Sequence, residues 1–196
     1  MQEVTVELIN NEIERFNKTN GCSEEVLKYL FKNPDHNDYN AVFCRVGLLD
    51  SLYSTGIQRY NKGGITAVTD HFCSFSDKMN SSLKMDIIDF QLYWDLVDVK
   101  YSHYSDLNGR ECKIYSFVSK YLSFCKPMTY PIMDLSVKKL MGISEYADYE
   151  EFCNYITEYR NKINTKLGMN YTVKEIDMFL WQLAKDIRLE NNHEEN

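Results

Sequence analysis

Lys120 and Asp134 are the two residues whose types and spacing could perform chemistry together. Lys120 lies in an apolar stripe at helical spacing, and Asp134 follows two prolines at the position expected for a helix N-cap. Because the prolines end the first helix and hold the connector extended, the amine and the carboxylate are expected to meet at one helix junction. The alternative is an ion pair that ties two helices together, with Asp134 also capping its helix.

The elements that must position this pair are predicted to be helices throughout. Apolar residues recur at helical intervals along most of the chain, strand-type alternation does not, and only 8 Gly and 3 Pro are present. We therefore expect an all-α chain of about eight or nine helices, with no sheet beyond a stray bridge. The expected helices cover residues 4–19, 24–32, 38 or 40 to 52, 65–75, 86–103, 115–124, 135–141, 148–166 and 173–189.

Local signals set the expected ends of these helices. Gly21 is expected to close the first helix, Ser23 to cap the second, and Asp38 or Asn40 to begin the third. The buried stripe of the third helix is expected to contain Val42, Phe43, Val46, Leu49 and Leu52. Asn108-Gly109 is read as the turn before the helix of Lys120, and Thr172 to Glu175 as a capping box.

The domain organisation is predicted to be simple. With 196 residues and 44% hydrophobic content, residues 1–196 suffice for one compact domain, and no linker or internal repeat divides the chain. We expect two helical lobes that meet at a cleft near Lys120 and Asp134, with the first helix able to pack against the C-terminal helices. Residues 190–196 are expected to form a frayed tail.

Cysteine and histidine placement argues against a metal site or a disulfide framework. The 6 Cys are widely spaced without a Cys-x-x-Cys pair, and the 4 His show no ligand spacing, so both are read as structural or surface residues. No apolar run is long enough to span a membrane, and the N-terminus lacks the features of a signal peptide. A cytoplasmic protein with reduced thiols, no metal, no cofactor and no membrane partner is expected.

Four short stretches resemble a known family. Ser119-Lys120 and Pro131 to Asp134 contain the candidate pair, residues 49–57 read LDSLYSTGI, and residues 176–183 read IDMFLWQL. On these stretches the chain resembles the helix-hairpin-helix superfamily of DNA glycosylases, and most closely the small bacterial proteins with an 8-oxoguanine-DNA-glycosylase-like fold. The resemblance implies a two-lobed helical fold with a divergent hairpin, because no Leu-Pro-Gly-Val-Gly sequence precedes Lys120.

The resemblance also implies an activity and a site. Lys120 would be the amine nucleophile and Asp134 the essential carboxylate of a base-excision hydrolase acting on DNA, with possible Schiff-base lyase activity. Partial burial beside apolar groups would lower the lysine pKa toward the uncharged form that attacks sugar carbon. The residues implied to contact DNA or the flipped base are Tyr53, Ser54, Thr55, Gly56, Tyr115, Ser119, Phe124 and Tyr130, with Trp94 as a further possible wall.

The charge balance keeps a second function open. The net charge of −7 is unfavourable for a DNA-binding protein, since lysine and arginine supply most of the non-specific affinity. A locally basic face is expected, formed by Lys113, Lys120, Lys126, Lys138 and Lys139. The turns at Gly56 and Gly63-Gly64 are either phosphate ligands or simple chain reversals. The alternative function is a non-catalytic helical module that binds nucleic acid or a protein partner.

Overall fold

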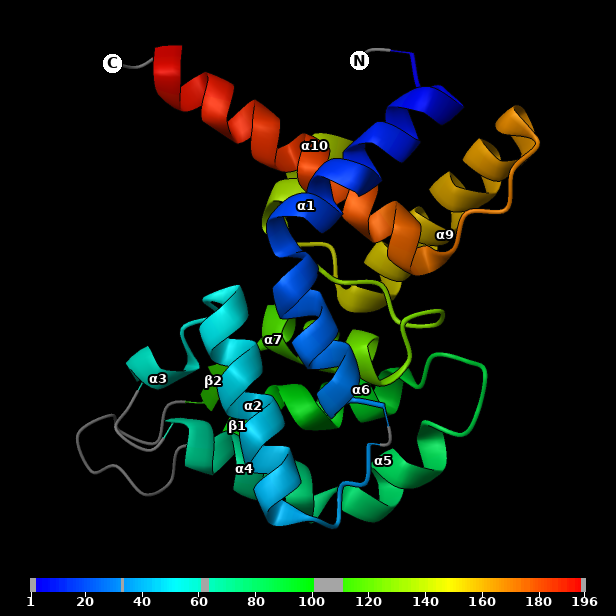
Figure 1. The fold of residues 1–196 in the computed structure, drawn as a ribbon. Helices are drawn as coiled ribbons and strands as arrows, with labels where there is room; N and C mark the ends of the chain where they lie inside the picture. The colour runs from blue at the N-terminus through cyan, green and yellow to red at the C-terminus, as the bar shows by residue number, and fades with distance from the viewer. Residues whose placement is uncertain (1–2, 33, 61–63, 101–110, 195–196) are drawn as a thin grey trace. The chain divides into compact units, whose positions relative to one another are not determined.

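The computed structural model describes residues 3–32, 34–60, 64–100 and 111–194, and in these residues the chain is almost entirely helical (Figure 1). The all-α expectation is therefore confirmed. The helices are α1 (Val6–Leu30), α2 (Tyr39–Tyr53), α3 (Ile57–Tyr60), α4 (Gly64–Ser74), α5 (Ser76–Ser82), α6 (Phe90–Val97), α7 (Tyr115–Cys125), α8 (Leu135–Met141), α9 (Tyr149–Leu167) and α10 (Val173–Glu194). Two short strands, β1 (Asp98–Lys100) and β2 (Glu111–Lys113), pair antiparallel.

The chain divides into two compact units. Unit 1 contains Met1–Cys22 together with Tyr130–Asn196, and unit 2 contains Ser23–Thr129. Helix α1 contributes its first part to unit 1 and its last part to unit 2. Lys120 consequently belongs to unit 2, and Asp134 belongs to unit 1.

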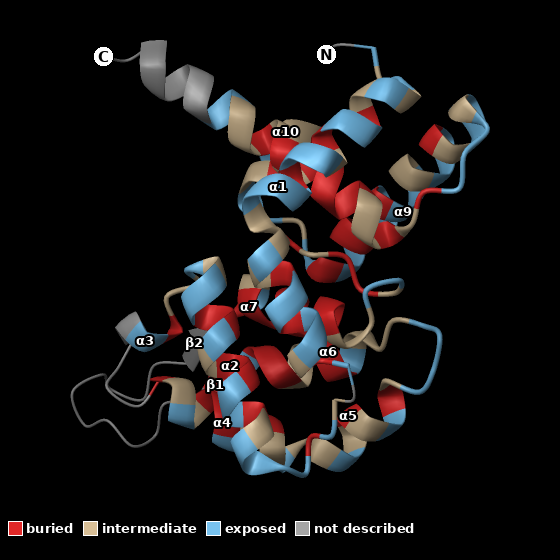
Figure 2. Ribbon diagram, in the orientation of Figure 1, coloured by how far each residue is buried: buried red, intermediate tan, exposed pale blue. Residues whose placement is uncertain are grey.

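Unit 1 packs the first part of α1 with helices α8, α9 and α10. Phe16 of α1 meets Trp181 of α10 edge to face, with ring centroids 5.5 Å apart, and Arg15 forms an ion pair with Asp186. Its apolar core is built from Ile9, Phe16, Phe152, Ile156, Ile176, Phe179 and Leu180. Figure 2 shows this buried face on the first part of α10.

Unit 2 packs α2, α4, α6 and the last part of α1 around the buried helix α7. Tyr121 of α7 is the centre of an aromatic cluster, with its ring 4.8 Å from that of Phe72 and 5.0 Å from that of Phe31. Eight consecutive residues of α7, from Phe117 to Phe124, are buried, and Figure 2 shows much of this helix in red. Such a helix must be surrounded by apolar neighbours on all sides.

The structure corrects the prediction of two separate N-terminal helices. Helix α1 continues through Gly21 and Ser23, so neither residue ends or begins a helix. A Cβ atom at Gly21 would meet nothing within 4 Å, and its backbone has an ordinary helical conformation. A glycine inside a helix costs only about 1 kcal/mol relative to alanine, which packing on either side can offset.

The buried stripe of α2 is also partly corrected. Val42, Val46 and Leu49 are buried as predicted, but Phe43 and Leu52 are exposed. The helix begins where expected, because the Asp38 side chain accepts a hydrogen bond from the Ala41 N–H.

The helix expected over residues 86–103 is shorter and is followed by β1. Asp89 is its N-cap and accepts a hydrogen bond from the Leu92 N–H, so Ile87 precedes the helix and is exposed. From Asp98 onward the chain pairs with β2, in the register Asp98 with Lys113 and Val99 with Cys112. Val99 is buried, so the β-branched residue here packs from an extended backbone. The expected Asn108-Gly109 turn lies outside the described residues.

Helix α10 begins at the expected capping box. The Thr172 N–H donates to Glu175 Oε2 and the Glu175 N–H donates to Thr172 Oγ1. The backbone remains helical to Glu194, where a frayed tail was expected from residue 190. Across the described part of the chain, no helix is both long and apolar enough to cross a membrane.

Candidate functional site

Lys120 lies in the middle of α7 and is buried, with an exposure of 6%. Its Nζ donates a hydrogen bond to Ser116 Oγ, one helical turn earlier, and lies 5.8 Å from the centre of the Tyr53 ring. The ammonium group is thus held between a hydroxyl and an aromatic face, which are the contacts that let a lysine leave bulk water. Ser116 was not among the residues predicted to form the site, although its spacing from Lys120 could have revealed it.

Tyr53 connects Lys120 to a buried acid. Its hydroxyl donates to Glu24 Oε1, and Glu24 on α1 has an exposure of 1%. The Tyr53 ring meets Phe124 edge to face with centroids 5.8 Å apart, and Phe124 lies one turn after Lys120. The structure therefore brings together three of the predicted site residues, Lys120, Tyr53 and Phe124, in one cluster. Glu24 was not among the site residues predicted from the sequence, because no local sequence pattern marks it as buried.

The turn after α2 is organised by Asp50. One carboxylate oxygen accepts hydrogen bonds from Thr55 Oγ1 at 2.5 Å and from the Ile57 N–H at 2.8 Å. The other accepts from the Gln58 N–H at 3.2 Å. The Thr55 hydroxyl and the amides at the start of α3 are thus already occupied by an internal carboxylate, which a phosphate would have to displace.

Ser54 and Gly56 give this turn its shape. Both have positive φ, 49° at Ser54 and 81° at Gly56, and Ser54 is exposed. A non-glycine residue in this region is uncommon and is tolerated in a helix C-cap. Within the turn that was predicted to contact DNA, the side chain of Ser54 is exposed to solvent.

Gly64 supports the chain-reversal reading of its turn. A Cβ atom at Gly64 would lie 2.2 Å from the Ile57 carbonyl oxygen, so only glycine fits this approach of α4 to α3. Gly63 lies outside the described residues.

Ser119 and Tyr115 make contacts outside the Lys120 cluster. Ser119 is fully buried and donates to the Ser116 carbonyl at 2.9 Å. Tyr115 precedes Lys120 by five residues, which turns its side chain about 140° away around the helix. It packs instead against Trp94, with ring centroids 6.0 Å apart. The two predicted aromatic walls Tyr115 and Trp94 therefore belong to a different face of α7.

In unit 1, Asp134 is the N-cap of α8, as predicted. Its Oδ1 accepts from the Ser136 N–H at 2.8 Å and from the Val137 N–H at 3.3 Å. Both cap bonds use the same oxygen, and Asp134 itself is partly exposed. The second carboxylate oxygen makes no hydrogen bond with the described residues.

The connector before Asp134 is fastened to α9 and α10. The Asp177 carboxylate accepts from the Ile132 N–H at 3.0 Å, and the Tyr149 hydroxyl donates to the Pro131 carbonyl at 2.8 Å. Tyr130 is fully buried in unit 1, where its ring contributes to the core. Neither Tyr149 nor Asp177 was singled out from the sequence, because their partners are distant in the chain.

Lys120, Lys126 and Lys138 of the predicted basic face each have partners within the protein. Lys126 donates to the Met85 carbonyl and forms an ion pair with Asp86 at 3.0 Å. Lys138 is buried and donates to the carbonyls of Glu145 and Ala147, and its burial lowers its pKa. Lys139 is exposed, and the Lys113 side chain lies outside the described residues.

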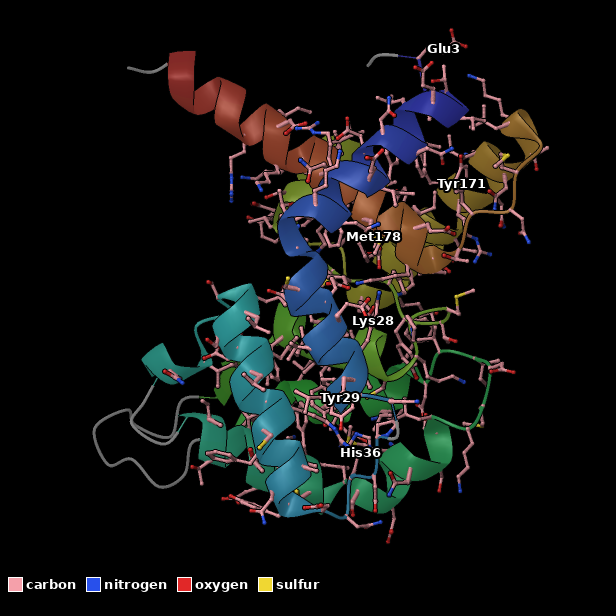
Figure 3. All side chains as sticks on the ribbon, viewed as in Figure 1. Glu3, Lys28, Tyr29, His36, Tyr171 and Met178 are labelled. Carbon is pink, nitrogen blue, oxygen red and sulfur yellow. The ribbon has the colours of Figure 1, made fainter. Side chains whose placement is uncertain are left out.

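His36 differs from its predicted surface position. It is fully buried in unit 2, at the place labelled in Figure 3, and its Nδ1 lies 3.0 Å from Asn80 Oδ1. Removal from water and the nearby Arg45 lower the pKa of His36 to about 4 despite the hydrogen bond to Asn80. A neutral imidazole therefore fills this polar pocket of the core at neutral pH. His103 lies outside the described residues, and only the backbone of His193 is described.

No metal-binding group emerges from the described residues. No set of three or more His, Cys, Asp or Glu side chains among them converges in a way that could hold a metal ion. Cys22, Cys44, Cys73, Cys125 and Cys153 are free thiols. Burial raises the pKa of Cys125 and Cys153, which disfavours the thiolate form of both.

Comparison with known proteins places most of the chain in a family. A family model described as "HI_0787_N: N-terminal domain" matches residues 6–129, from α1 to just beyond α7. An uncharacterized protein of Haemophilus influenzae is 27% identical over 149 residues, which cover 74% of this chain and 67% of the relative. No solved structure matches the chain. Lys120 lies inside the family match and Asp134 beyond it, and since the match spans more than half of the sequence, this chain belongs to the HI_0787_N N-terminal domain family.

Proposed function

We propose that the chain is a DNA glycosylase-like protein that excises a damaged or modified base. Lys120 is the amine nucleophile and Asp134 the carboxylate, within a two-lobed glycosylase-like fold whose hairpin is divergent. The observation that carries the proposal is the placement of Lys120, a lysine taken out of water on a core helix between Ser116 and Tyr53. A lysine with a purely structural role is more often found at a helix surface.

Each residue has a defined step in this reaction. The Lys120 nitrogen bonds to the anomeric carbon of the sugar while the base leaves with the electrons of the glycosidic bond and gains a proton. The role proposed for the Asp134 carboxylate is to stabilise the positive charge that develops on the sugar. Opening of the sugar ring gives a Schiff base, from which proton loss can break the strand. Tyr53 and Phe124 supply aromatic faces for an extruded base.

A second candidate function is a non-catalytic module that binds nucleic acid or a protein partner. It is favoured by the low exposure of Lys120, because a nucleophile must reach a sugar carbon. It is also favoured by the occupied amides of the Asp50 turn. In this case Lys120 and Glu24 serve the packing of unit 2.

Borohydride trapping separates the two functions. The protein is incubated with oligonucleotides that carry different damaged bases or an abasic site, and borohydride then reduces any Schiff base to a stable adduct. The glycosylase proposal expects a covalent adduct in the wild type and none in Lys120→Gln or Lys120→Arg. Base release should fall at least about tenfold in Asp134→Asn, since loss of the negative charge removes a transition-state interaction.

Matched variants control for folding and for nonspecific amines. Lys126→Gln removes a lysine at the end of the same helix, and Asp148→Asn changes the N-cap of α9 in the same way that Asp134→Asn changes α8. Both should retain trapping and base release. No adduct with any substrate, or an adduct that survives in both Lys120 variants, would support the non-catalytic module.

A further inference from the structure

Tyr53, the last residue of α2, lies where α1, α2 and α7 meet within unit 2 (Figure 1). Its hydroxyl donates to Glu24 Oε1 on α1, and its ring meets Phe124 of α7 edge to face. Lys120 Nζ, also on α7, lies over the ring at 5.8 Å from its centre. Tyr53 is therefore in contact with three groups, and the hydrogen bond to Glu24 is the directional contact among them.

Glu24 is the buried partner of this tyrosine. Its exposure is 1%, whereas Glu25, the next residue of α1, is exposed and forms an ion pair with Lys28. A buried carboxyl group costs free energy unless hydrogen bonds replace those it made with water. The hydrogen bond from the Tyr53 hydroxyl, which comes from another helix, offsets part of this cost. The same bond fixes the direction in which the Tyr53 ring points.

The Lys120 amine is held from two sides. Its Nζ donates to Ser116 Oγ one turn earlier on α7, and the face of the Tyr53 ring attracts its positive charge. An aromatic ring attracts a cation only while its face is turned toward that cation, because the edge of the ring is electropositive. Since Glu24 orients the ring, the place of the Lys120 amine depends on Glu24.

We infer that Glu24 is a positioning residue for Lys120 and acts through the hydroxyl and the ring of Tyr53. Ser116 restrains the same amine from within α7. The four side chains belong to unit 2, so this arrangement is formed within a single unit. The use of Lys120 as a nucleophile rests on the proposed function, whereas the positioning of its amine does not.

Trace acetylation of the folded protein tests the positioning directly. Acetic anhydride reacts with uncharged amines, and peptide mass spectrometry compares Lys120 with the exposed Lys139 as internal reference. Glu24→Leu and Tyr53→Phe should each raise the relative acetylation of Lys120 by about two- to fivefold, which corresponds to the loss of one cation–π contact. The double variant should show no larger increase than the single variants, because both substitutions break the same hydrogen bond.

Two variants of α1 serve as controls. Glu24→Gln keeps an amide oxygen that can accept from the Tyr53 hydroxyl, so it should keep most of the protection that Glu24→Leu loses. Glu25→Leu removes the exposed neighbouring acid and should leave the acetylation of Lys120 unchanged. Circular dichroism and thermal unfolding verify that every variant compared is folded.

Borohydride trapping then measures the consequence for the proposed reaction. Glu24→Leu frees more uncharged amine, by about two- to fivefold, but a displacement of about 1 Å from the reacting position can cost about a hundredfold in rate. The rate of adduct formation should therefore fall at least about fivefold in Glu24→Leu, opposite in direction to its acetylation. Glu24→Gln should restore most of this rate.

The two measurements fail separately. A wild type that forms no adduct would contradict the glycosylase proposal, while the acetylation of Lys120 would still decide the role of Glu24. Unchanged acetylation in Glu24→Leu, an equal increase in Glu24→Gln, additive effects in the double variant, or faster trapping in Glu24→Leu would overturn the inference.

Discussion

Four buried ionisable side chains of unit 2 have specific polar contacts. Glu24 accepts from the Tyr53 hydroxyl, Arg45 donates to two backbone carbonyls, and Asp50 receives a hydroxyl and two amides. His36 faces Asn80. Burying such groups costs free energy unless hydrogen bonds compensate. Replacing any one of them should therefore leave its buried partner without a hydrogen bond and destabilise the folded state.

His36 should make the folded state sensitive to mild acid. Its pKa is lowered to about 4 in the folded protein and is about 6.5 in an unfolded chain, so between these values the unfolded state binds the extra proton. Stability from this residue is complete above pH 6.5 and is lost as pH falls toward 4. The free energy of unfolding should drop by about 2 kcal/mol between pH 7 and pH 5.

Urea denaturation of the wild type and of His36→Gln measures this effect. The variant is expected to be less stable at pH 7 but to lose about 2 kcal/mol less than the wild type between pH 7 and pH 5. Asp35 and Arg45, which both act on His36, are unchanged in the comparison. Equal pH dependence in the two proteins would show that His36 titrates normally in the folded state.

At the scale of the element, two helical glycines should respond to alanine in opposite directions. Gly21 lies inside α1 with open space where a Cβ would stand, so Gly21→Ala should stabilise the protein by about 0.5–1 kcal/mol. At Gly64 a Cβ would lie 2.2 Å from the Ile57 carbonyl oxygen, so Gly64→Ala should destabilise it by about 1–3 kcal/mol. Thermal unfolding followed by circular dichroism measures both changes.

The two substitutions control each other, since they add the same methyl group to helices. A stabilising Gly64→Ala would contradict the close approach of α4 to Ile57. A destabilising Gly21→Ala would contradict the continuous helix at that position.

At the scale of the whole molecule, the two tryptophans report on different units. Trp181 lies in unit 1 beside Phe16, and Trp94 lies in unit 2 beside Tyr93. Because α1 contributes to both units and helix formation is cooperative, we expect both units to unfold in one transition. Phe16→Ala removes a buried ring from unit 1, which typically costs about 3 kcal/mol, and should lower the unfolding midpoint reported by either tryptophan.

Fluorescence-detected urea unfolding of Trp94→Phe and Trp181→Phe, with and without Phe16→Ala, makes this measurement. If Phe16→Ala lowers only the midpoint seen by Trp181, then α1 does not couple the units.

The sequence by itself determined the helical class and several helix ends. Asp134 and Thr172 were correctly predicted to cap helices, and Asp38 was one of two candidates for its cap, because a cap is made between residues two or three positions apart. Lys120 was likewise placed correctly within a helix of apolar neighbours. It follows that a single sequence suffices for features whose hydrogen-bond partners are local.

Only the tertiary structure decided which groups face inward and which helices continue. Gly21 resembles a helix end, yet α1 passes through it, because packing far along the chain outweighs a local cost of about 1 kcal/mol. Glu24 is buried because Tyr53 reaches it, and Arg45 because the Leu30 and Asp35 carbonyls receive it. Phe43 and Leu52 look like core residues in the sequence, but they are exposed, whereas Arg45 and Asp50 are buried on the inner side of α2 together with Val42, Val46 and Leu49. Hydrophobic periodicity cannot reveal such an exchange, since it depends on partners that the fold alone brings together.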